Sequence, residues 1–348
     1  MKALLSYGNY KGEIAELPVP EISDDEVLVK IVYCGICGTD QDLFSSDCSF
    51  AKDGLVTYPV RLGHEWSGIV EEVGKNVSRF KKGDKVVGEN AVACGVCAAC
   101  KKGNYSECEH MLNVGTIDPV YDGAFCEYYV IPERHLHKVP EGLTLKMGCL
   151  AEPFSVAYGG IKRMKITENS TVAVIGTGCI AMAAIVLSKC LGAKEVFVIG
   201  RNSEKLRVAC ELGATVINIR ECNAVEKINE LTSGKGADFV FECSGAKGTY
   251  SQAMEIAAFR ATVALIGFYA NKEDDVNVDT VVSKALSIFG VMGEPDIMSG
   301  ALSVLEKYKP NILPIITDEL EFEDSLKGFT RSNYPNAIKI AVKIGEEE

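Results

Sequence analysis

The sequence predicts an α/β protein whose second half forms a doubly wound parallel sheet. From residue 171 onward, short β-branched runs alternate with helical segments, and a glycine-rich turn directly follows the first run. Such alternation is typical of parallel strands with helices on both faces of the sheet. The predicted strands are residues 171–176, 194–200, 238–245 and 262–268.

The turn after the first predicted strand reads GTGCIA, which places Gly176, Gly178 and Ala181 in Gly-x-Gly-x-x-Ala spacing. A motif this short is weak evidence alone, but here it joins a strand to a helix. In that context the backbone N–H groups at the helix start meet a pyrophosphate. We therefore expect a dinucleotide to bind at this turn.

The end of the second predicted strand indicates which dinucleotide binds. NAD sites carry Asp or Glu there, about twenty residues after the turn, to bond the ribose 2′-hydroxyl. This chain has Gly200 instead, followed by Arg201 and Lys205. The missing carboxylate removes repulsion against a 2′-phosphate, and the basic side chains add positive charge. We favour NADP over NAD; the alternative is that Arg201 points into solvent and either cofactor is used.

The composition fits a globular protein with room for two domains, because 348 residues contain 47% hydrophobic and 24% charged side chains. The formal net charge of −12 repels polyanions, so we expect no nucleic-acid partner. The N-terminus lacks a signal-peptide core, and no apolar run of roughly 18 residues occurs. We therefore expect a cytoplasmic protein without membrane association, in which thiols stay reduced.

Four cysteines crowd the stretch CGVCAACKKGNYSEC, namely Cys94, Cys97, Cys100 and Cys108. Two-residue gaps let successive thiolates converge on one tetrahedral ion. An iron–sulfur cluster is the alternative, but ferredoxin-like runs normally end in Cys-Pro. Four thiolates leave no open position for a substrate, so we predict a structural zinc site. The chemistry of the protein must then lie elsewhere.

A second set of metal ligands is spread through the N-terminal half of the chain. Cys37, His64, Glu65 and Glu152 offer one thiolate, one imidazole and two carboxylates. Three such ligands plus a water form an open, catalytic zinc site. We expect Asp40, three residues after Cys37, to accept the other N–H of the His64 ring.

Several stretches resemble the zinc-dependent medium-chain dehydrogenases, in order and over essentially the whole chain. They are GICGTD, GHEWSGIVEEVG, CGVCAACKKGNYSEC, DGAFCEYYVIP and AEPFSVA. Within that superfamily, Glu65 and the Glu152-Pro153 pair resemble the polyol (sorbitol) dehydrogenase branch. Alcohol dehydrogenases proper would have a cysteine near Glu152, and threonine dehydrogenases commonly have Asp-Pro there.

The resemblance implies a GroES-like β-barrel catalytic domain and a Rossmann nucleotide-binding domain. The catalytic domain would comprise residues 1–155 and 291–348, with a zinc-binding lobe at 94–108, and the nucleotide domain residues 156–290. The resemblance also implies two zinc ions per chain, one catalytic and one structural, and a homo-oligomer, either a tetramer or a dimer. The catalytic zinc set carried over by position is Cys37, His64, Glu65 and Glu152, with some exchange between the two carboxylates.

The resemblance also assigns roles in catalysis and cofactor binding. Family members often read Cys-Gly-[Ser/Thr]-Asp-x-His, in which the histidine helps pass a proton to solvent. Thr39 keeps the hydroxyl that bonds the substrate oxygen, but Asp42 stands at the histidine position, so the far end of the relay is altered. Thr39, Asp42 and Glu152 are thus the expected catalytic residues. The residues expected along the nicotinamide and ribose are Ile180, Ile266, Gly267, Val291 and Met292.

The expected reaction is the reversible oxidation of a secondary alcohol to a ketone with NADP(H) or NAD(H). A carboxylate-rich metal site suits a small hydroxyl-rich substrate: a polyol, a cyclitol or a sugar-alcohol phosphate. L-Threonine 3-dehydrogenase activity is the nearest enzymatic alternative. A second alternative is a non-catalytic NADP-binding protein with structural zinc only, which the altered relay at Asp42 favours and the complete second ligand set disfavours.

Overall fold

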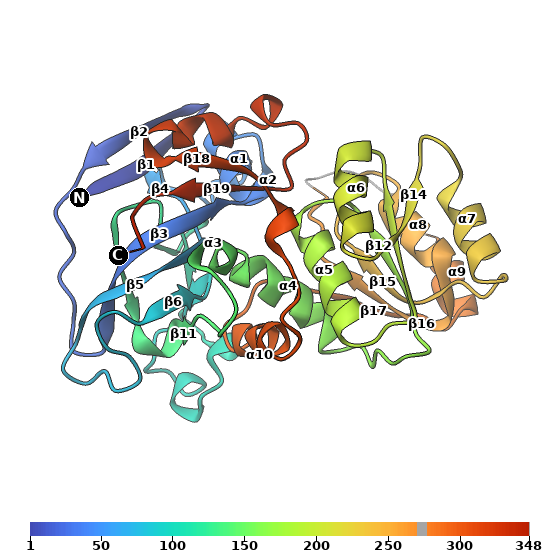
Figure 1. The fold of residues 1–348 in the computed structure, drawn as a ribbon, viewed down its shortest axis with the longest axis horizontal. Helices are drawn as coiled ribbons and strands as arrows, with labels where there is room; N and C mark the ends of the chain where they lie inside the picture. The colour runs from blue at the N-terminus through green and yellow to red at the C-terminus, as the bar shows by residue number, and fades with distance from the viewer. Residues whose placement is uncertain (270–276, 348) are drawn as a thin grey trace. The chain divides into compact units, whose positions relative to one another are not determined.

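The computed structural model describes residues 1–269 and 277–347, which fold into two compact units (Figure 1). The first unit comprises Met1–Ser155, Gly293–Lys309 and Ile316–Glu348, so both ends of the chain build it. The second comprises Val156–Met292 and Pro310–Ile315. Residues 270–276, which fall in the expected nucleotide domain, and residue 348 lie outside the described part.

The first unit is built around a seven-stranded sheet in the order β11-β6-β5-β3-β19-β18, with β10 also paired to β3. All pairs are antiparallel except β18–β19. The central strand β3 is buried along most of its length, which explains its near-continuous apolar sequence. The strands are β3 (Glu26–Ile36), β5 (Glu65–Val73), β6 (Lys85–Gly88), β10 (Tyr128–Pro132), β11 (Leu136–Lys138), β18 (Ile316–Glu321) and β19 (Lys339–Lys343).

Two small sheets and several short helices complete the first unit. One sheet has the order β2-β1-β4 and the other β7-β8-β9. Their strands are β1 (Lys2–Gly8), β2 (Lys11–Glu16), β4 (Val60–Arg61), β7 (Ala91–Val92), β8 (Leu112–Val114) and β9 (Val120–Tyr121). The helices are α1 (Gly38–Ser45), α2 (Ser49–Lys52), α3 (Leu145–Gly148), α10 (Met298–Tyr308) and the start of α4 (Ala151–Ile161).

The second unit contains the predicted parallel sheet. Its six strands have the order β14-β13-β12-β15-β16-β17, and every pair is parallel. Numbered within this sheet, the order is 3-2-1-4-5-6, the doubly wound arrangement that places a switch point between β12 and β15. The strands are β12 (Thr171–Ile175), β13 (Glu195–Gly200), β14 (Thr215–Asn218), β15 (Ala237–Glu242), β16 (Ala257–Leu265) and β17 (Ser287–Gly290).

Helices connect the parallel strands, as the alternating sequence predicts. They are α5 (Cys179–Cys190), α6 (Ser203–Glu211), α7 (Ala224–Leu231), α8 (Thr249–Ile256) and α9 (Val278–Ser283). Asparagine side chains cap three of them: Asn202, Asn223 and Asn277 each accept backbone N–H groups of the first turn. Within residues 1–269 and 277–347, no helix is both long and apolar enough to cross a membrane.

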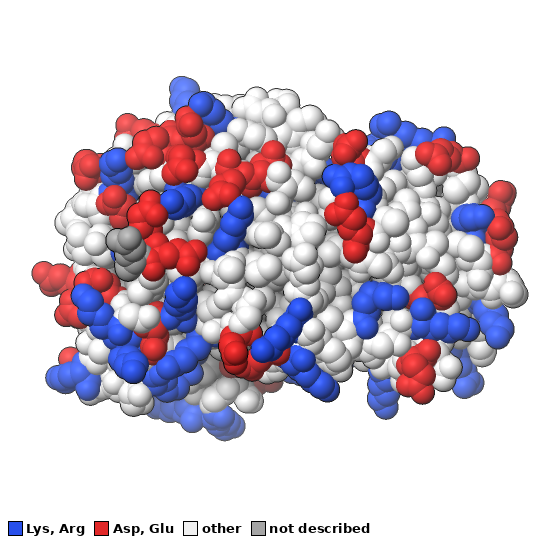
Figure 2. All heavy atoms as spheres, in the orientation of Figure 1, with Lys and Arg blue, Asp and Glu red and all other residues white. Residues whose placement is uncertain are grey.

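Charged side chains of both signs are interspersed on the face of the molecule drawn in Figure 2, with uncharged surface between them. Lysine and arginine side chains occur there together with aspartate and glutamate side chains, rather than forming a uniformly basic surface. Many of the described charges form short surface pairs, such as Lys52–Asp47 at 2.7 Å and Lys327–Asp324 at 2.6 Å.

Candidate active site and metal centres

The first candidate metal centre joins Cys37, His64 and Glu65. One ligand atom from each lies within 4.8 Å of the other two. Cys37 is the residue before α1, whereas His64 and Glu65 stand at the start of β5. Strands β3 and β5 pair with Gly35 opposite Glu65, and this register brings the three residues together. One thiolate, one imidazole and one carboxylate are the donor set of an open zinc site.

The Asp40 carboxylate contacts the backbone and the histidine of this centre. Its Oδ2 accepts the Cys37 backbone N–H at 2.8 Å, and its Oδ1 accepts the Gly63 N–H at 3.2 Å. The same Oδ1 lies 3.6 Å from His64 Nδ1, a buried nitrogen without a hydrogen-bond partner among the described residues. Burial raises the pKa of Asp40, while the His64 charge opposes that rise. The predicted supporting position of Asp40 at Nδ1 therefore fits a metal bound to the other ring nitrogen of His64, Nε2.

A buried lysine neutralises the carboxylate of this centre. Lys339 Nζ forms an ion pair with Glu65 Oε2 and donates to the Ile36 carbonyl at 3.1 Å. Both side chains of the pair are almost completely buried. Sequence reasoning missed Lys339, which lies 274 positions from Glu65 and carries no motif. The one sign of this crowded site in the sequence is a glycine at position 35. A Cβ on Gly35 would lie less than 3.0 Å from Glu65 Oε2.

Glu152 lies beside the centre but outside the close group of three ligand atoms. It stands in the first turn of α4, is 5% exposed, and its Oε1 accepts a hydrogen bond from Asn90 Nδ2 at 2.6 Å. Burial raises the pKa of its carboxyl to about 7, and the charge on Glu65 adds to that rise. The opposing charges of His64 and Lys339 lower it. Glu152 is therefore a buried carboxyl that can exist in either protonation state near neutral pH.

The two residues expected in the proton relay occupy different environments in α1. Thr39 is partly buried in the first turn, one residue from Asp40. Asp42 lies nearer the surface, where its Oδ1 accepts from Arg331 Nη2 at 2.7 Å. The same Arg331 nitrogen donates to the Gly38 carbonyl at 3.0 Å. The residue at the histidine position is therefore paired with an exposed arginine, a partner that the sequence did not indicate.

The second candidate centre joins the four cysteines of the predicted lobe. Their sulfur atoms all lie within 4.8 Å of one another, and none of the four forms a disulfide. Backbone N–H groups point at the sulfurs, with Cys94 N–H donating to Cys108 Sγ at 3.3 Å. Such hydrogen bonds lower the pKa of Cys97 to about 6, whereas burial raises the pKa of Cys100 to about 12. This closed thiol set fits a structural zinc ion.

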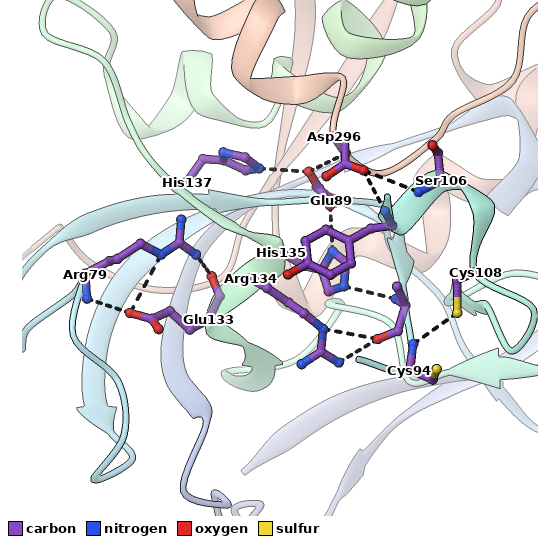
Figure 3. A network of polar contacts seen from close by, with 12 residues as sticks. Arg79, Glu89, Cys94, Ser106, Cys108, Glu133, Arg134, His135, His137 and Asp296 are labelled. Carbon is purple, nitrogen blue, oxygen red and sulfur yellow. Dashed lines mark hydrogen bonds and ion pairs between the residues drawn. The ribbon is translucent and has the colours of Figure 1, made fainter. Parts of the chain in front are cut away.

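A buried polar network fixes the lobe to the rest of the first unit (Figure 3). Glu89 Oε2 lies 2.7 Å from His135 Nδ1, and Glu89 Oε1 lies 2.9 Å from His137 Nε2. His135 Nε2 accepts the Ala93 N–H at 3.0 Å, so the His135 proton is on Nδ1, toward Glu89. Asp296 Oδ2 accepts the Tyr105 N–H of the lobe at 2.9 Å. Sequence reasoning missed this network.

The glycine turn of the second unit has the geometry of a phosphate cradle. Gly176 has φ of 115°, a backbone region in which side chains are strained. Gly178 is the residue before the twelve-residue helix α5, and a Cβ at this position would meet open space. The space beside Gly178 is thus open at the start of α5, the end of a helix that attracts anions.

The end of β13 brings Gly200 against this turn. A Cβ on Gly200 would lie less than 3.0 Å from Thr177 Cγ2. Arg201 is exposed, and Lys205 lies in the first turn of α6, where its N–H bonds to the Asn202 side chain. A positive charge at this corner of the second unit remains consistent with a 2′-phosphate, and no carboxylate occupies position 200.

The remaining residues expected at the cofactor follow the carboxyl ends of the same sheet. Ile180 is partly buried and Ala181 fully buried in α5. Gly267 approaches the Gly245 backbone so closely that a Cβ would clash with it. The other three are Ile266, which is 8% exposed, Val291, whose N–H donates to the Leu265 carbonyl at 2.9 Å, and Met292, which is 59% exposed.

A parallel nucleotide-binding sheet and a β-sheet unit with a Cys-His-Glu centre together define a class, the zinc-dependent medium-chain dehydrogenases. The chain belongs to this superfamily and to its sorbitol dehydrogenase-like branch. It matches the family described as "Alcohol dehydrogenase GroES-like domain" over residues 23–141 and "Zinc-binding dehydrogenase" over residues 179–307. The predicted superfamily and fold class are thus confirmed, and the chain is an NAD(P)-dependent alcohol dehydrogenase.

Individual relatives cover almost the whole chain. It is 31% identical to "Sorbitol dehydrogenase" of Bacillus subtilis (strain 168), over 95% of this chain and 93% of that one. It is 33% identical to "L-threonine 3-dehydrogenase" of Bacillus velezensis, over 94% of each. Among solved structures, a putative zinc-binding dehydrogenase from Sinorhizobium meliloti 1021 bound to NADP has a TM-score of 0.89 at 27% identity, covering 99% of each chain.

Proposed function

We propose that this dehydrogenase oxidises a secondary alcohol group of a polyol, a cyclitol or a sugar-alcohol phosphate to a ketone, reversibly, and that it prefers NADP(H) to NAD(H). The observation that carries the proposal is the Cys37–His64–Glu65 group with a further buried carboxyl, Glu152, beside it. A site so rich in carboxylates favours substrates with several hydroxyl groups, which can donate hydrogen bonds to it.

Cys37, His64 and Glu65 would hold the catalytic zinc, with Glu152 able to exchange with Glu65. When bound, zinc supplies Lewis-acid chemistry that lowers the pKa of a substrate hydroxyl, and the nicotinamide supplies the hydride acceptor. Asp40 orients the His64 ring through its Nδ1 side. Lys339 balances the charge of Glu65, so that the centre does not carry two uncompensated carboxylates.

Side chains of α1 would carry the proton. The Thr39 hydroxyl accepts the proton of the substrate hydroxyl and passes it toward solvent. Asp42 would form the outer end of this route, with Arg331 holding its carboxylate in place. The hydride step does not depend on Asp42, because no proton moves with the hydride.

The four cysteines Cys94, Cys97, Cys100 and Cys108 would hold a second, structural zinc, giving two zinc ions per chain. Support comes from the mutual distances of the sulfurs and from the N–H groups directed at them. Metal analysis of the purified protein tests this stoichiometry. Two zinc ions per chain are expected; one ion, retained in the absence of Cys37 and His64, would contradict the catalytic centre.

Substrate class is tested with a panel of polyols, cyclitols, their phosphates and L-threonine, following NADPH and NADH absorbance. Turnover of a polyhydroxy compound is expected. L-Threonine is included because one relative that is 33% identical is an L-threonine 3-dehydrogenase. Turnover confined to L-threonine would replace the proposed substrate class, although it would leave the zinc site and the hydride reaction intact.

A further inference from the structure

Asn90 connects the candidate active site to the network that anchors the cysteine lobe. It stands between β6 and β7, and its Nδ2 donates to Glu152 Oε1 at 2.6 Å. The next residue toward the N-terminus is Glu89, the centre of the buried network in Figure 3. The short hydrogen bond therefore joins a carboxyl beside the candidate zinc centre to a rigid part of the first unit.

The backbone around Asn90 is fixed on both sides. Its carbonyl accepts the Val114 N–H at 3.0 Å. The neighbouring Glu89 side chain is held by two histidine rings, and its Oε1 also accepts the Asp296 N–H at 3.1 Å. Buried hydrogen-bonded groups of this kind leave a side chain few alternative positions.

Gly293 confines the amide from the opposite direction. A Cβ on Gly293 would lie less than 3.0 Å from Asn90 Nδ2, and the three nearest heavy atoms to it all belong to the Asn90 side chain. Gly293 does not have a positive φ, so its backbone conformation is open to any residue. The amide thus has just enough room to reach Glu152 because position 293 is glycine.

We propose that Asn90 is a positioning residue that restrains Glu152 at the edge of the metal centre. With Glu152 restrained, it could replace Glu65 on the ion but not bind beside it, so the ion would have three protein ligands and an open position for substrate. A released Glu152 would supply a fourth protein ligand and close the coordination shell, as four thiolates do in a structural site. This inference rests on the proposed zinc-dependent function.

The experiment uses the full-length enzyme with Co²⁺ exchanged into the catalytic centre and zinc kept in the cysteine site. Asn90→Ala should change the visible cobalt spectrum, because spectra of this ion report coordination number and geometry. It should also lower kcat about 10-fold, the effect typical of losing a group that orients a ligand. Gly293→Ala, whose methyl group displaces the Asn90 amide, should change the spectrum in the same way.

The Glu152→Gln variant tests whether Asn90→Ala acts through Glu152 or through a general disturbance of the structure. In a Glu152→Gln background, adding Asn90→Ala should leave the cobalt spectrum unchanged, because the carboxylate that Asn90 restrains is gone. Asn76→Ala is the matched control, since that amide also donates to a carboxylate, Asp25 Oδ1 at 3.0 Å, but at the exposed surface; it should have the wild-type spectrum.

Two results would overturn the inference while leaving the proposed function intact: a wild-type spectrum in Asn90→Ala, or a spectral change that persists in the Glu152→Gln background. A wild-type cobalt spectrum that His64→Ala does not alter would instead overturn the proposed function, and this inference with it.

Discussion

Gly200 is subject to two constraints, one from cofactor binding and one from packing. The position faces the ribose in the predicted cofactor site, but it also packs against Thr177 of the glycine turn. An aspartate introduced at position 200 would collide with Thr177 Cγ2. A loss of NADP use in Gly200→Asp could therefore come from this collision rather than from repulsion between the new carboxylate and the 2′-phosphate. Arg201, exposed and free of that constraint, is the cleaner probe of cofactor choice.

Arg201→Ala should lower kcat/KM for NADP about tenfold or more and leave the value for NAD nearly unchanged. A charge-assisted hydrogen bond to the 2′-phosphate contributes about 1.5–3 kcal/mol, and 1.4 kcal/mol is roughly tenfold. Arg207→Ala is the matched control, because Arg207 pairs with Glu204 and Glu211 on the same helix. A wild-type enzyme that prefers NAD would refute the assignment of Arg201.

Reversal of the preference requires the double variant Gly200→Asp/Thr177→Ser. The serine removes the methyl group that a Cβ at position 200 would meet. The new carboxylate then bonds the 2′-hydroxyl of NAD and repels a 2′-phosphate. Steady-state kinetics with both cofactors, with Thr177→Ser alone as the reference, measure the switch.

His64→Ala should abolish turnover and release one zinc ion while leaving NADPH binding intact. The imidazole is one of the three candidate ligands of the centre, whereas the glycine turn belongs to the other unit. The loss should exceed the roughly 100-fold cost of removing a residue that only supports a ligand. Metal content, kcat and NADPH fluorescence titration are the measurements, with the exposed His110→Ala as control. Retained activity would contradict the zinc-dependent mechanism.

At the scale of elements, the cysteine lobe, residues 94–108, has little core of its own. Between Cys94 and Cys108 the structure has only two short 3₁₀ turns, η1 (Cys100–Lys102) and η2 (Tyr105–Glu107). Most of its residues are exposed or only partly buried. The hydrogen bond from the Tyr105 N–H to Asp296 and the edge-on contact between the Tyr105 and His135 rings hold the segment in place, and the proposed zinc ion would add to them.

Cys97→Ser should remove one zinc ion per chain and destabilise the lobe, because a four-thiolate site contributes directly to local folding. Protease cleavage within residues 94–108 should become faster than in wild type. Cys210→Ser, which changes an exposed free cysteine on α6, should have no such effect. Full zinc content and unchanged cleavage in Cys97→Ser would rule out the structural site.

Glu89→Gln should lower the free energy of unfolding by about 1–3 kcal/mol at neutral pH. Burial raises the pKa of Glu89, but the hydrogen bonds from His135 and His137 outweigh it and hold the pKa at about 2, below the ordinary 4.5. A depressed pKa gives stability that is complete above pH 4.5 and is lost as the pH falls toward 2. The difference in the free energy of unfolding between wild type and Glu89→Gln should therefore become smaller below pH 4.5.

Urea unfolding across this pH range measures the effect. Glu323→Gln is the control, because Glu323 pairs with Lys2 at the exposed surface, where ion pairs contribute little. A difference that stays constant through the acid range would show that the Glu89 carboxylate is not the stabilising group.

At the scale of the whole molecule, contacts between distant parts of the chain complete the active site. Lys339 of β19 joins Glu65 at the start of β5 because both strands pair with β3. The C-terminal strand thus supplies the charge that balances a residue of the N-terminal half. Truncation before β19 would remove Lys339 and leave the Glu65 carboxylate buried and unpaired.

We predict that the enzyme is a homo-oligomer, a tetramer or a dimer, as its resemblance to polyol dehydrogenases implies. Sedimentation velocity of the zinc-loaded protein should give a mass of two or four times the 37.5 kDa chain. A monomer across the accessible concentration range would refute this prediction.

Much of this architecture was predictable because its determinants are local in sequence. The parallel sheet follows from strands and helices that alternate between residues 171 and 268, and the Gly176–Gly178 turn lies within one strand–helix junction. The four cysteines fall within fifteen residues, so their spacing alone limits how they can converge. Local geometry of this kind is fixed by bond lengths and allowed backbone angles.

The partners of the catalytic centre were decided only by the tertiary structure. Lys339, Asn90 and the histidines that hold Glu89 have no motif around them, and residue type alone does not distinguish them from surface side chains. They act because strand pairing and buried packing bring them to carboxylates 46 to 274 positions away. A buried charge must find a partner wherever the folded chain provides one, and sequence spacing does not determine where that is.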